Sequence, residues 1–237
     1  MRTTLAQFNE TQSTDAFSLQ NAKLLKVSLR EGAIQARLGS MVAYQGEVGF
    51  EHAGSGGVGR LLKKALTGEG LRLMKMEGSG EVFLADQAQD VHLIYLEGDK
   101  ITVNGENVLA FDSDIDWDIQ RMEGASGMMG GGLYNTALQG TGWVAVLSDG
   151  APVLLDVGAA PTFADAQAAI TWSSGVSTSI KTDVKLLKNL TGRGSGESVQ
   201  MAFSGSGWVL VQPSEGRVQA PADGGGAGGG LGKMLGG

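Results

Sequence analysis

The chain has 237 residues, 42% of them hydrophobic, which is enough for one large or two small domains with a buried core. Its 18 Lys and Arg residues against 25 Asp and Glu residues give a formal net charge of −7, which disfavours broad binding to nucleic-acid phosphates. Cysteine is absent, and this excludes disulfides, thiolate zinc sites and a cysteine nucleophile. The 39 glycines, without collagen periodicity, indicate many tight turns or flexible segments.

Residues 1–20 are polar and aperiodic, and we expect them to form an N-terminal segment outside the folded core. The first ten residues have one basic side chain, Arg2, and no apolar run typical of a signal peptide. The longest apolar runs of the chain are strand-sized, far below the roughly 20 residues of a membrane-spanning helix. The sequence therefore predicts a soluble, cytoplasmic protein.

From Lys23 to residue 212 the pattern is that of short strands punctuated by glycine. The stretch 99–111 is typical of two short strands joined at Asn104-Gly105, a strong hairpin signal. Many short strands with glycine-rich connections predict a sandwich, barrel or prism.

An internal repeat is the main indication of architecture. The pattern Gly-x-Gly-x-Val occurs three times, at spacings of 62 and 65 residues, and its glycines are Gly78 and Gly80, Gly140 and Gly142, and Gly205 and Gly207. A fixed spacing means that one supersecondary unit is used several times. We interpret these six residues as structural glycines that form turns.

A second motif, a small apolar pair followed by an aromatic residue, recurs out of phase with the first. Its copies are Val42-Ala43-Tyr44 before Phe50, Leu109-Ala110-Phe111 before Trp117, and Phe163-Ala164-Asp165 before Trp172. Two alternating motifs describe three β-units of about 60 to 70 residues. We predict an all-β single domain, residues 21–213, of three pseudo-threefold-related units in a prism-like or sandwich-like fold. One or two short helical turns are expected, at residues 61–66 and 186–190.

Residues 214–237 form a glycine-rich tail, and this composition predicts a flexible coil. Its apolar tip, Leu231, Met234 and Leu235, is a candidate contact with a neighbouring protein or a membrane surface. Met128 and Met129, in a glycine-rich stretch of the second unit, are a second candidate contact.

Three segments carry a family resemblance: Gly68-Glu69-Gly70, the run 132–142 (Gly-Leu-Tyr-Asn-Thr-Ala-Leu-Gln-Gly-Thr-Gly) and Gly205-Ser206-Gly207. Over about residues 20–212 the chain resembles the altered inheritance of mitochondria protein 24 family, formerly a domain of unknown function. The resemblance implies a fold similar to that of the tryptophan RNA-binding attenuation protein, and it brings no catalytic residues. The N-terminus lacks the Arg-rich, acid-poor composition of a transit peptide, so the chain looks like a bacterial member.

The sharpest candidate site is an acidic run. Carboxylates at positions 1, 3, 5, 7 and 12 imitate a calcium loop, and the residues are Asp112, Asp114, Asp116, Asp118 and Glu123. The sixth position, which needs glycine for the sharp turn, is Trp117. The simpler interpretation is a strand whose alternate Asp side chains share a solvated face.

Other site classes find little support. No glycine-rich stretch has the Gly-x-x-x-x-Gly-Lys-Ser/Thr pattern of a phosphate loop, and His52 and His92 lie in no catalytic motif. We expect the four Trp residues to be packing residues, because an RNA-stacking platform also needs surrounding positive charge.

These observations predict a non-enzymatic β-scaffold or protein-interaction module without a cofactor. We expect it to associate with itself or with a protein partner, and not with nucleic acid. The alternative is a small-molecule or divalent-metal-binding module that uses the acidic run.

Overall fold

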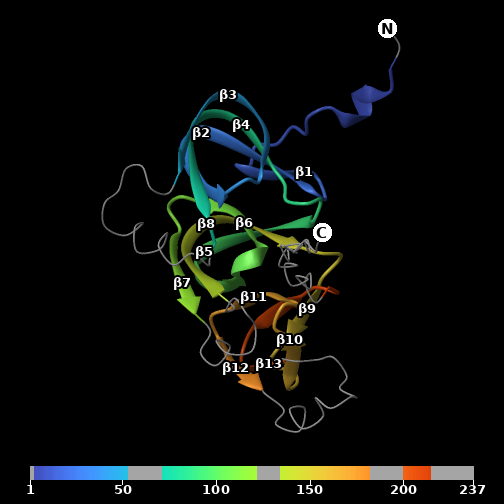
Figure 1. Cartoon of the computed structure of the whole chain (residues 1–237), viewed down its shortest axis with the longest axis vertical. Helices are drawn as coiled ribbons and strands as arrows, with labels where there is room; N and C mark the ends of the chain where they lie inside the picture. Colours follow the sequence, from blue (N-terminus) through green and yellow to red (C-terminus); the bar gives the residue numbers. More distant parts are fainter. Residues whose placement is uncertain (1–2, 53–70, 122–133, 182–199, 215–237) are drawn as a thin grey trace, which may run out of the picture.

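The computed structural model describes residues 3–52, 71–121, 134–181 and 200–214 (Figure 1). Within these ranges the regular structure is almost entirely β-strand, with two single turns of 3-10 helix, η1 (Leu5–Phe8) and η2 (Gly105–Asn107). The strands are β1 (Phe17–Asn21), β2 (Leu24–Arg37), β3 (Met41–His52), β4 (Leu73–Leu84), β5 (Asp90–Asn104), β6 (Val108–Asp112), β7 (Asp116–Arg121), β8 (Tyr134–Ser148), β9 (Val153–Asp156), β10 (Thr162–Asp165), β11 (Ala169–Ser173), β12 (Val176–Lys181), β13 (Gln200–Gly205) and β14 (Trp208–Val211).

The strands form two sheets, and all their pairings are antiparallel. The larger sheet has eleven strands in the order β3-β4-β2-β6-β8-β5-β11-β14-β9, with β1 paired to β2 and β7 paired to β8. The smaller sheet has the order β10-β13-β12. The predicted all-β class is therefore confirmed, and the sheets are open, whereas the pseudo-threefold relation of the units stays a prediction.

The hairpin predicted at Asn104-Gly105 is wrong. β5 and β6 do not pair with each other, because β8 lies between them and pairs with both. The connection is η2, whose first turn is capped by the Asn104 side chain accepting from the Glu106 backbone N–H. Arg37 holds this turn from β2, since its guanidinium donates to the carbonyl oxygens of Gly105, Glu106 and Val108.

The polar N-terminal segment is shorter than expected. β1 begins at Phe17, and its register places Phe17 opposite Val27 of β2. The Phe17 ring is buried and stacks on Trp143 at 6.5 Å between ring centroids. The helical turns predicted at 61–66 and 186–190, and nearly all of the glycine-rich tail, lie outside the described residues.

The repeated glycines do not all form turns. Gly78 and Gly80 lie inside β4, and Gly140 and Gly142 lie inside β8. All six repeat glycines have positive φ, which L-residues with a side chain rarely adopt. A Cβ on Gly80 would lie 2.1 Å from the carbonyl oxygen of Gln45 in β3. Glycine at this position therefore lets a long strand bend while its partner backbone approaches closely.

Strand pairing also corrects the third copy of the second motif. Tyr44 lies opposite Val82, Phe111 opposite Val144 and Trp172 opposite Val209. Trp172 is therefore the counterpart of Tyr44 and Phe111 in strand pairing. The motif had aligned Phe163-Ala164-Asp165 with them, but these residues lie in β10 and pair with β13.

The buried apolar residues form three clusters along the sheet. The first contains Phe17, the second Phe111 and the third Trp172. Trp143 packs against the first cluster, and Trp117 and Trp208 pack against the second. All four tryptophans are therefore packing residues, as predicted. Among the described residues, no helix has the length and apolar character needed to cross a membrane.

Candidate functional site

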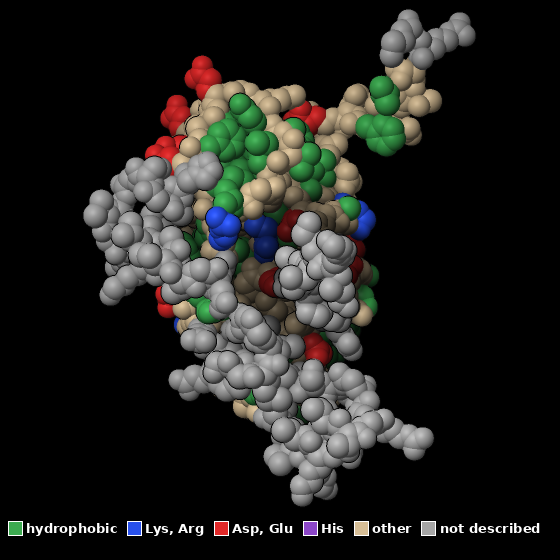
Figure 2. Space-filling view, in the orientation of Figure 1, with side chains coloured by type: hydrophobic (Ala, Val, Ile, Leu, Met, Phe, Trp, Pro, Cys, Tyr) green, Lys and Arg blue, Asp and Glu red, His purple; other side chains and the backbone are tan. Residues whose placement is uncertain are grey.

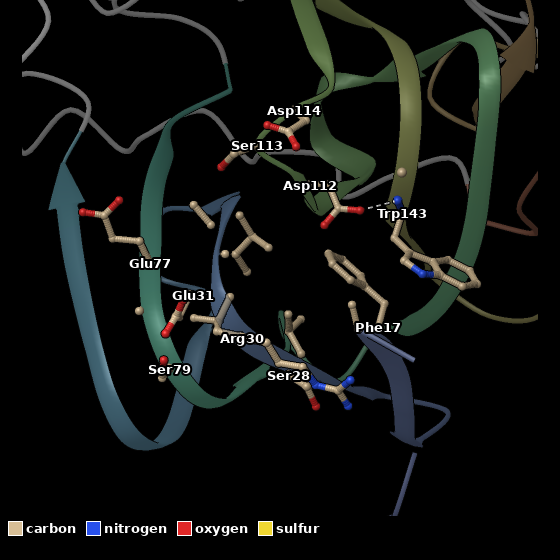
Figure 3. Close-up of a pocket in the computed structure, with 18 of the residues that line it drawn as sticks. Phe17, Ser28, Arg30, Glu31, Glu77, Ser79, Asp112, Ser113, Asp114 and Trp143 are labelled. Atoms are coloured by element: carbon tan, nitrogen blue, oxygen red, sulfur yellow. Dashed lines mark hydrogen bonds between the residues drawn. The ribbon is translucent and has the colours of Figure 1, made fainter. Parts of the chain in front are cut away.

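A groove of about 980 Å³ lies where the ladder of the large sheet is interrupted (Figure 3). Strands β2 and β4 form one wall, and the turn from Asp112 to Asp114 lies opposite them. Phe17 and Trp143 line the remaining side. A volume of this size is at the upper end of the range for small-molecule sites.

The interruption follows from the partners of β2. β1 pairs with β2 as far as Val27, and the Ser28 N–H donates to the Ala16 carbonyl oxygen at 2.8 Å. Pairing on this side resumes only at Ile34, where β6 begins its contact. From Leu29 to Gly32, β2 has no partner strand on this side among the described residues.

A bulge marks the same stretch of β2. The register shifts between Arg30 and Gly32, so that Glu31 stands out of the ladder with φ +58°. A left-handed backbone is strained for a residue with a side chain, and such strain often accompanies functional positions. Glu31 and Arg30 are both exposed and line the groove.

The wall formed by β8 has a matching gap. β7 pairs with β8 as far as Gln139, and β6 pairs with it from Val144. In the gap the Trp143 N–H donates to Asp112 Oδ2 at 2.6 Å (Figure 3). A Cβ on Gly142 would lie 2.7 Å from the same carboxylate oxygen, so glycine leaves the space that Asp112 occupies.

The Asp112 carboxyl is half-buried, and this burial raises its pKa above the ordinary value. The hydrogen bond from the Trp143 N–H lowers the pKa, whereas the neighbouring charge of Asp114 raises it further. A cation bound in the groove would favour the ionised form of Asp112.

Aromatic side chains line the side of the groove next to β8. Trp143 contacts Tyr95 edge to face at 5.0 Å between ring centroids, and it stacks on Phe17. The buried side chains of Leu29 and Ile34 add aliphatic surface. The groove thus combines an apolar lining with a rim of carboxylates.

The acidic run does not form one ligand set. Asp112 ends β6 and binds the Trp143 N–H, Asp114 lies in the following turn, and Asp116 and Asp118 lie two residues apart on β7. Asp116 and Asp118 are exposed, as a solvated strand face predicts, and Glu123 lies outside the described residues. No group of three His, Cys, Asp or Glu side chains in the described ranges could hold a metal ion.

The two histidines lie in different settings. His92 Nε2 donates to Ser148 Oγ at 2.7 Å, because the Ser148 hydroxyl itself donates to the Gly150 carbonyl oxygen. Burial lowers the pKa of His92, and the nearby Asp90 charge partly opposes this. His52 is the last residue of β3. Met128, Met129, Leu231, Met234 and Leu235 lie outside the described residues.

Sequence reasoning missed most of the groove. The polar composition of residues 1–20 gives no sign that Phe17 is a core residue, and no sequence motif points to Tyr95, Arg30 or Glu31. One signal was available: β2 and β5 each bulge opposite a Gly-x-Gly pair, at Glu31 and at Gly98. Glycine is the ordinary choice at a left-handed bulge, so a glutamate there points to another role.

A second candidate surface lies at the ends of the large sheet. β3 is one terminal strand, and Met41, Val42 and Tyr44 on it are exposed. β9 is the other terminal strand, and Val153 and Leu154 on it are exposed. Figure 2 shows hydrophobic side chains gathered over the β3–β4 end of the molecule, with acidic side chains beside them.

Comparison with known proteins identifies the family. A protein-family model described as mitochondrial biogenesis AIM24 matches residues 17–214, from the first residue of β1 to just beyond β14. The chain belongs to the AIM24 family. Its AIM24 fold is similar to the crystal structure of a Streptococcus pyogenes protein, with a TM-score of 0.68 and 20% identity over 84% of this chain and 92% of that one. No curated protein sequence matches this AIM24 chain.

Proposed function

We propose that this AIM24-family protein is a non-enzymatic β-scaffold that associates with copies of itself, edge to edge. The observation that carries the proposal is that both terminal strands of the large sheet expose apolar side chains. A sheet edge presents unpaired backbone groups, and monomeric proteins usually protect such edges with Lys, Pro or a covering element. β3 is twelve residues long and contains neither Lys nor Pro.

The internal joints of the sheet support this mode of association. β2 joins β6 through three residue pairs, Ile34 with Asp112, Gln35 with Phe111 and Ala36 with Ala110. β5 joins β11 through three pairs of the same antiparallel kind. Short antiparallel contacts therefore suffice to extend this sheet, and pairing of β3 in one copy with β9 in the next would continue it.

The polar groups of the described residues support a non-enzymatic role. Asp112, His92 and Ser148 each make a hydrogen bond that fixes the fold. The net charge of −7 argues against nucleic acid as the partner. The proposal keeps the cytoplasmic location expected from the sequence, with which a chain free of cysteine is compatible.

Two matched variants test the edge pairing. Val42 on β3 and Leu154 on β9 are each 61% exposed, so Val42→Lys and Leu154→Lys place a charge on an edge without disturbing the core. We expect wild type to sediment as an oligomer and each variant alone as a monomer. In a mixture, the unaltered β3 of the Leu154→Lys variant can pair with the unaltered β9 of the Val42→Lys variant. The remaining edges of such a pair both carry Lys, so the mixture gives dimers and nothing larger.

The mixing experiment separates the alternatives. If Val42→Lys abolishes association and Leu154→Lys has no effect, the copies pair through β3 alone and the head-to-tail arrangement is wrong. A monomeric wild type at all concentrations, measured by sedimentation velocity, overturns the proposal of self-association.

A further inference from the structure

The groove beside β2 is separate from the strand edges that edge-to-edge association would use. Its lining comes from β1, β2, β4, β5, β8 and the turn after β6, whereas the exposed edge residues of β3 and β9 do not line it. The two surfaces can therefore be tested separately.

The open stretch of β2 offers backbone hydrogen bonds to a ligand. The Ser28 N–H points to the β1 side, where it donates to Ala16. Because backbone groups alternate along a strand edge, the N–H and C=O of Arg30 point to the same side. On that side the pairing strands stop at Val27 and resume at Ile34. A strand of about four residues, roughly 13 Å long, would fill the gap.

The charges around the groove select for a cationic ligand. Four carboxylates line it, and one guanidinium, that of Arg30, opposes them. Glu77 is paired with Lys75, which leaves Glu31, Asp112 and Asp114 as the acidic groups that face a ligand. The Asp112 carboxylate uses one oxygen for the Trp143 N–H, and Figure 3 shows its other oxygen directed away from that bond.

The groove also has an unsatisfied polar group and an apolar surface. The Ser113 hydroxyl oxygen is buried and has no hydrogen-bond partner among the described residues. Such groups are rare in folded proteins and call for an explanation, for which a bound ligand is one source. Tyr95 and Trp143 give aromatic surface on which an aliphatic stem or a cation can lie.

We propose that this groove binds an extended polypeptide segment with alternating basic and apolar side chains, which adds as a strand to β2 between Ser28 and Ile34. The bound backbone pairs with Arg30, the basic side chains face Glu31, Asp112 and Asp114, and the apolar side chains pack on Tyr95 and Trp143. Strand addition is a common mode of peptide recognition, in which backbone bonds give affinity and side-chain pockets give specificity.

The test measures binding of a fluorescein-labelled hexapeptide to the full chain by fluorescence anisotropy. The peptide has alternating Val and Lys residues and blocked ends. Three comparison peptides separate the contributions: alternating Val and Glu reverses the charge, a central Pro blocks strand pairing, and lysine amide tests a small amine alone. We expect the Val-Lys peptide to bind, the Pro peptide to bind at least about tenfold more weakly, and the other two not to bind.

Variants of exposed carboxylates then locate the site. Asp114→Asn and Glu31→Gln should each weaken binding about two- to fivefold, the size of one solvated ion pair. Glu97→Gln, beside the corresponding bulge of β5, removes an exposed carboxylate outside the groove and should change nothing. In NMR hydrogen exchange, the Arg30 amide should gain protection when the Val-Lys peptide binds.

Other results overturn the proposal. Equal binding of the Pro peptide, or binding of lysine amide at similar affinity, shows a site for a basic group without strand addition. Equal binding of the Val-Glu peptide, or an unchanged affinity in the Asp114→Asn and Glu31→Gln double variant, shows that the carboxylates do not recognise the ligand. Repeating the titration with the monomeric Val42→Lys variant separates this result from self-association.

Discussion

Replacing Gly80 by Ala should destabilise the protein strongly, although the change adds one methyl group. Gly80 lies inside β4 with φ +158°, and its neighbour across the ladder is β3. A Cβ would lie 2.1 Å from the Gln45 carbonyl oxygen and 3.1 Å from Val48 Cγ2. The nearer atom belongs to the backbone, so the clash is relieved only if β3 moves away from β4.

Two contributions make up the expected loss. An L-residue in this region of φ costs about 1 kcal/mol relative to glycine. Forcing an extra carbon into a packed backbone contact costs about 2 kcal/mol more. The unfolding free energy should therefore fall by about 3 kcal/mol, which corresponds to a decrease in melting temperature of roughly 6 to 12 °C for a chain of this size.

Two other glycines separate the contributions. Gly39 has φ +88° but open space around its Cβ position, so Gly39→Ala should show only the backbone cost. Gly32 has open space and no positive φ, so Gly32→Ala should be neutral or slightly stabilising. Urea unfolding followed by tryptophan fluorescence measures all three. If Gly80→Ala unfolds at the same urea concentration as Gly32→Ala, close approach of β3 and β4 is not what requires glycine.

Three further predictions concern polar groups that are partly buried. Arg37→Lys keeps at most one of the three hydrogen bonds to the carbonyl oxygens around η2. The variant should therefore lower the unfolding free energy by about 3 kcal/mol, measured by urea titration. Arg72→Lys, at an exposed site, is the control and should have no effect in the same titration. The raised pKa of Asp112 means that the folded state favours the protonated carboxyl. The resulting gain in unfolding free energy is fully present below the unfolded pKa of about 4 and is lost as the pH rises through the folded pKa. Asp112→Asn should remove this decline, and parallel curves for wild type and variant in urea titrations from pH 3 to 7 would contradict the assignment. The lowered pKa of His92 has the opposite consequence, because the folded state favours the neutral imidazole. The resulting gain in unfolding free energy is present above the unfolded pKa of about 6.5 and is lost as the pH falls through the folded pKa. His92→Gln should remove that loss between pH 7 and 5, measured as melting temperature.

The fold class was predictable because strand length and glycine spacing are local properties of the sequence. The pairing of the strands was not. Asn104-Gly105 has the local signature of a hairpin, yet β5 and β6 each pair with β8, 15 residues long, which comes later in the chain. Val144, Ala145 and Val146 of β8 are buried and pair with both β5 and β6, and this pairing outweighs the local turn preference.

The groove was less predictable, because it depends on where partner strands end. In the sequence Asp112 belongs to a run that resembles a calcium loop. In the structure its carboxylate accepts a hydrogen bond from the Trp143 backbone N–H, 31 residues away in the chain. Phe17 reads as an isolated aromatic in a polar segment, and only the pairing of β1 with β2 brings it against Trp143. Sequence periodicity describes which faces are apolar, but it does not describe where one strand stops covering another.

The position of β8 between β5 and β6 also has a consequence for synthesis of the protein. The interval between synthesis of Asn104 and synthesis of Ser148 separates completion of β5 from completion of β8, the strand that joins it to β6. At about 5 to 20 residues per second this interval lasts roughly 2 to 9 s. During that time β5 lacks both of its neighbours in the sheet, β8 and β11, whereas β6 lacks only β8 because β2 precedes it. Arrival of β8 therefore sets the earliest moment at which the β5 and β6 residues of the second core cluster can be covered, and Ile170 of β11 joins the cluster later.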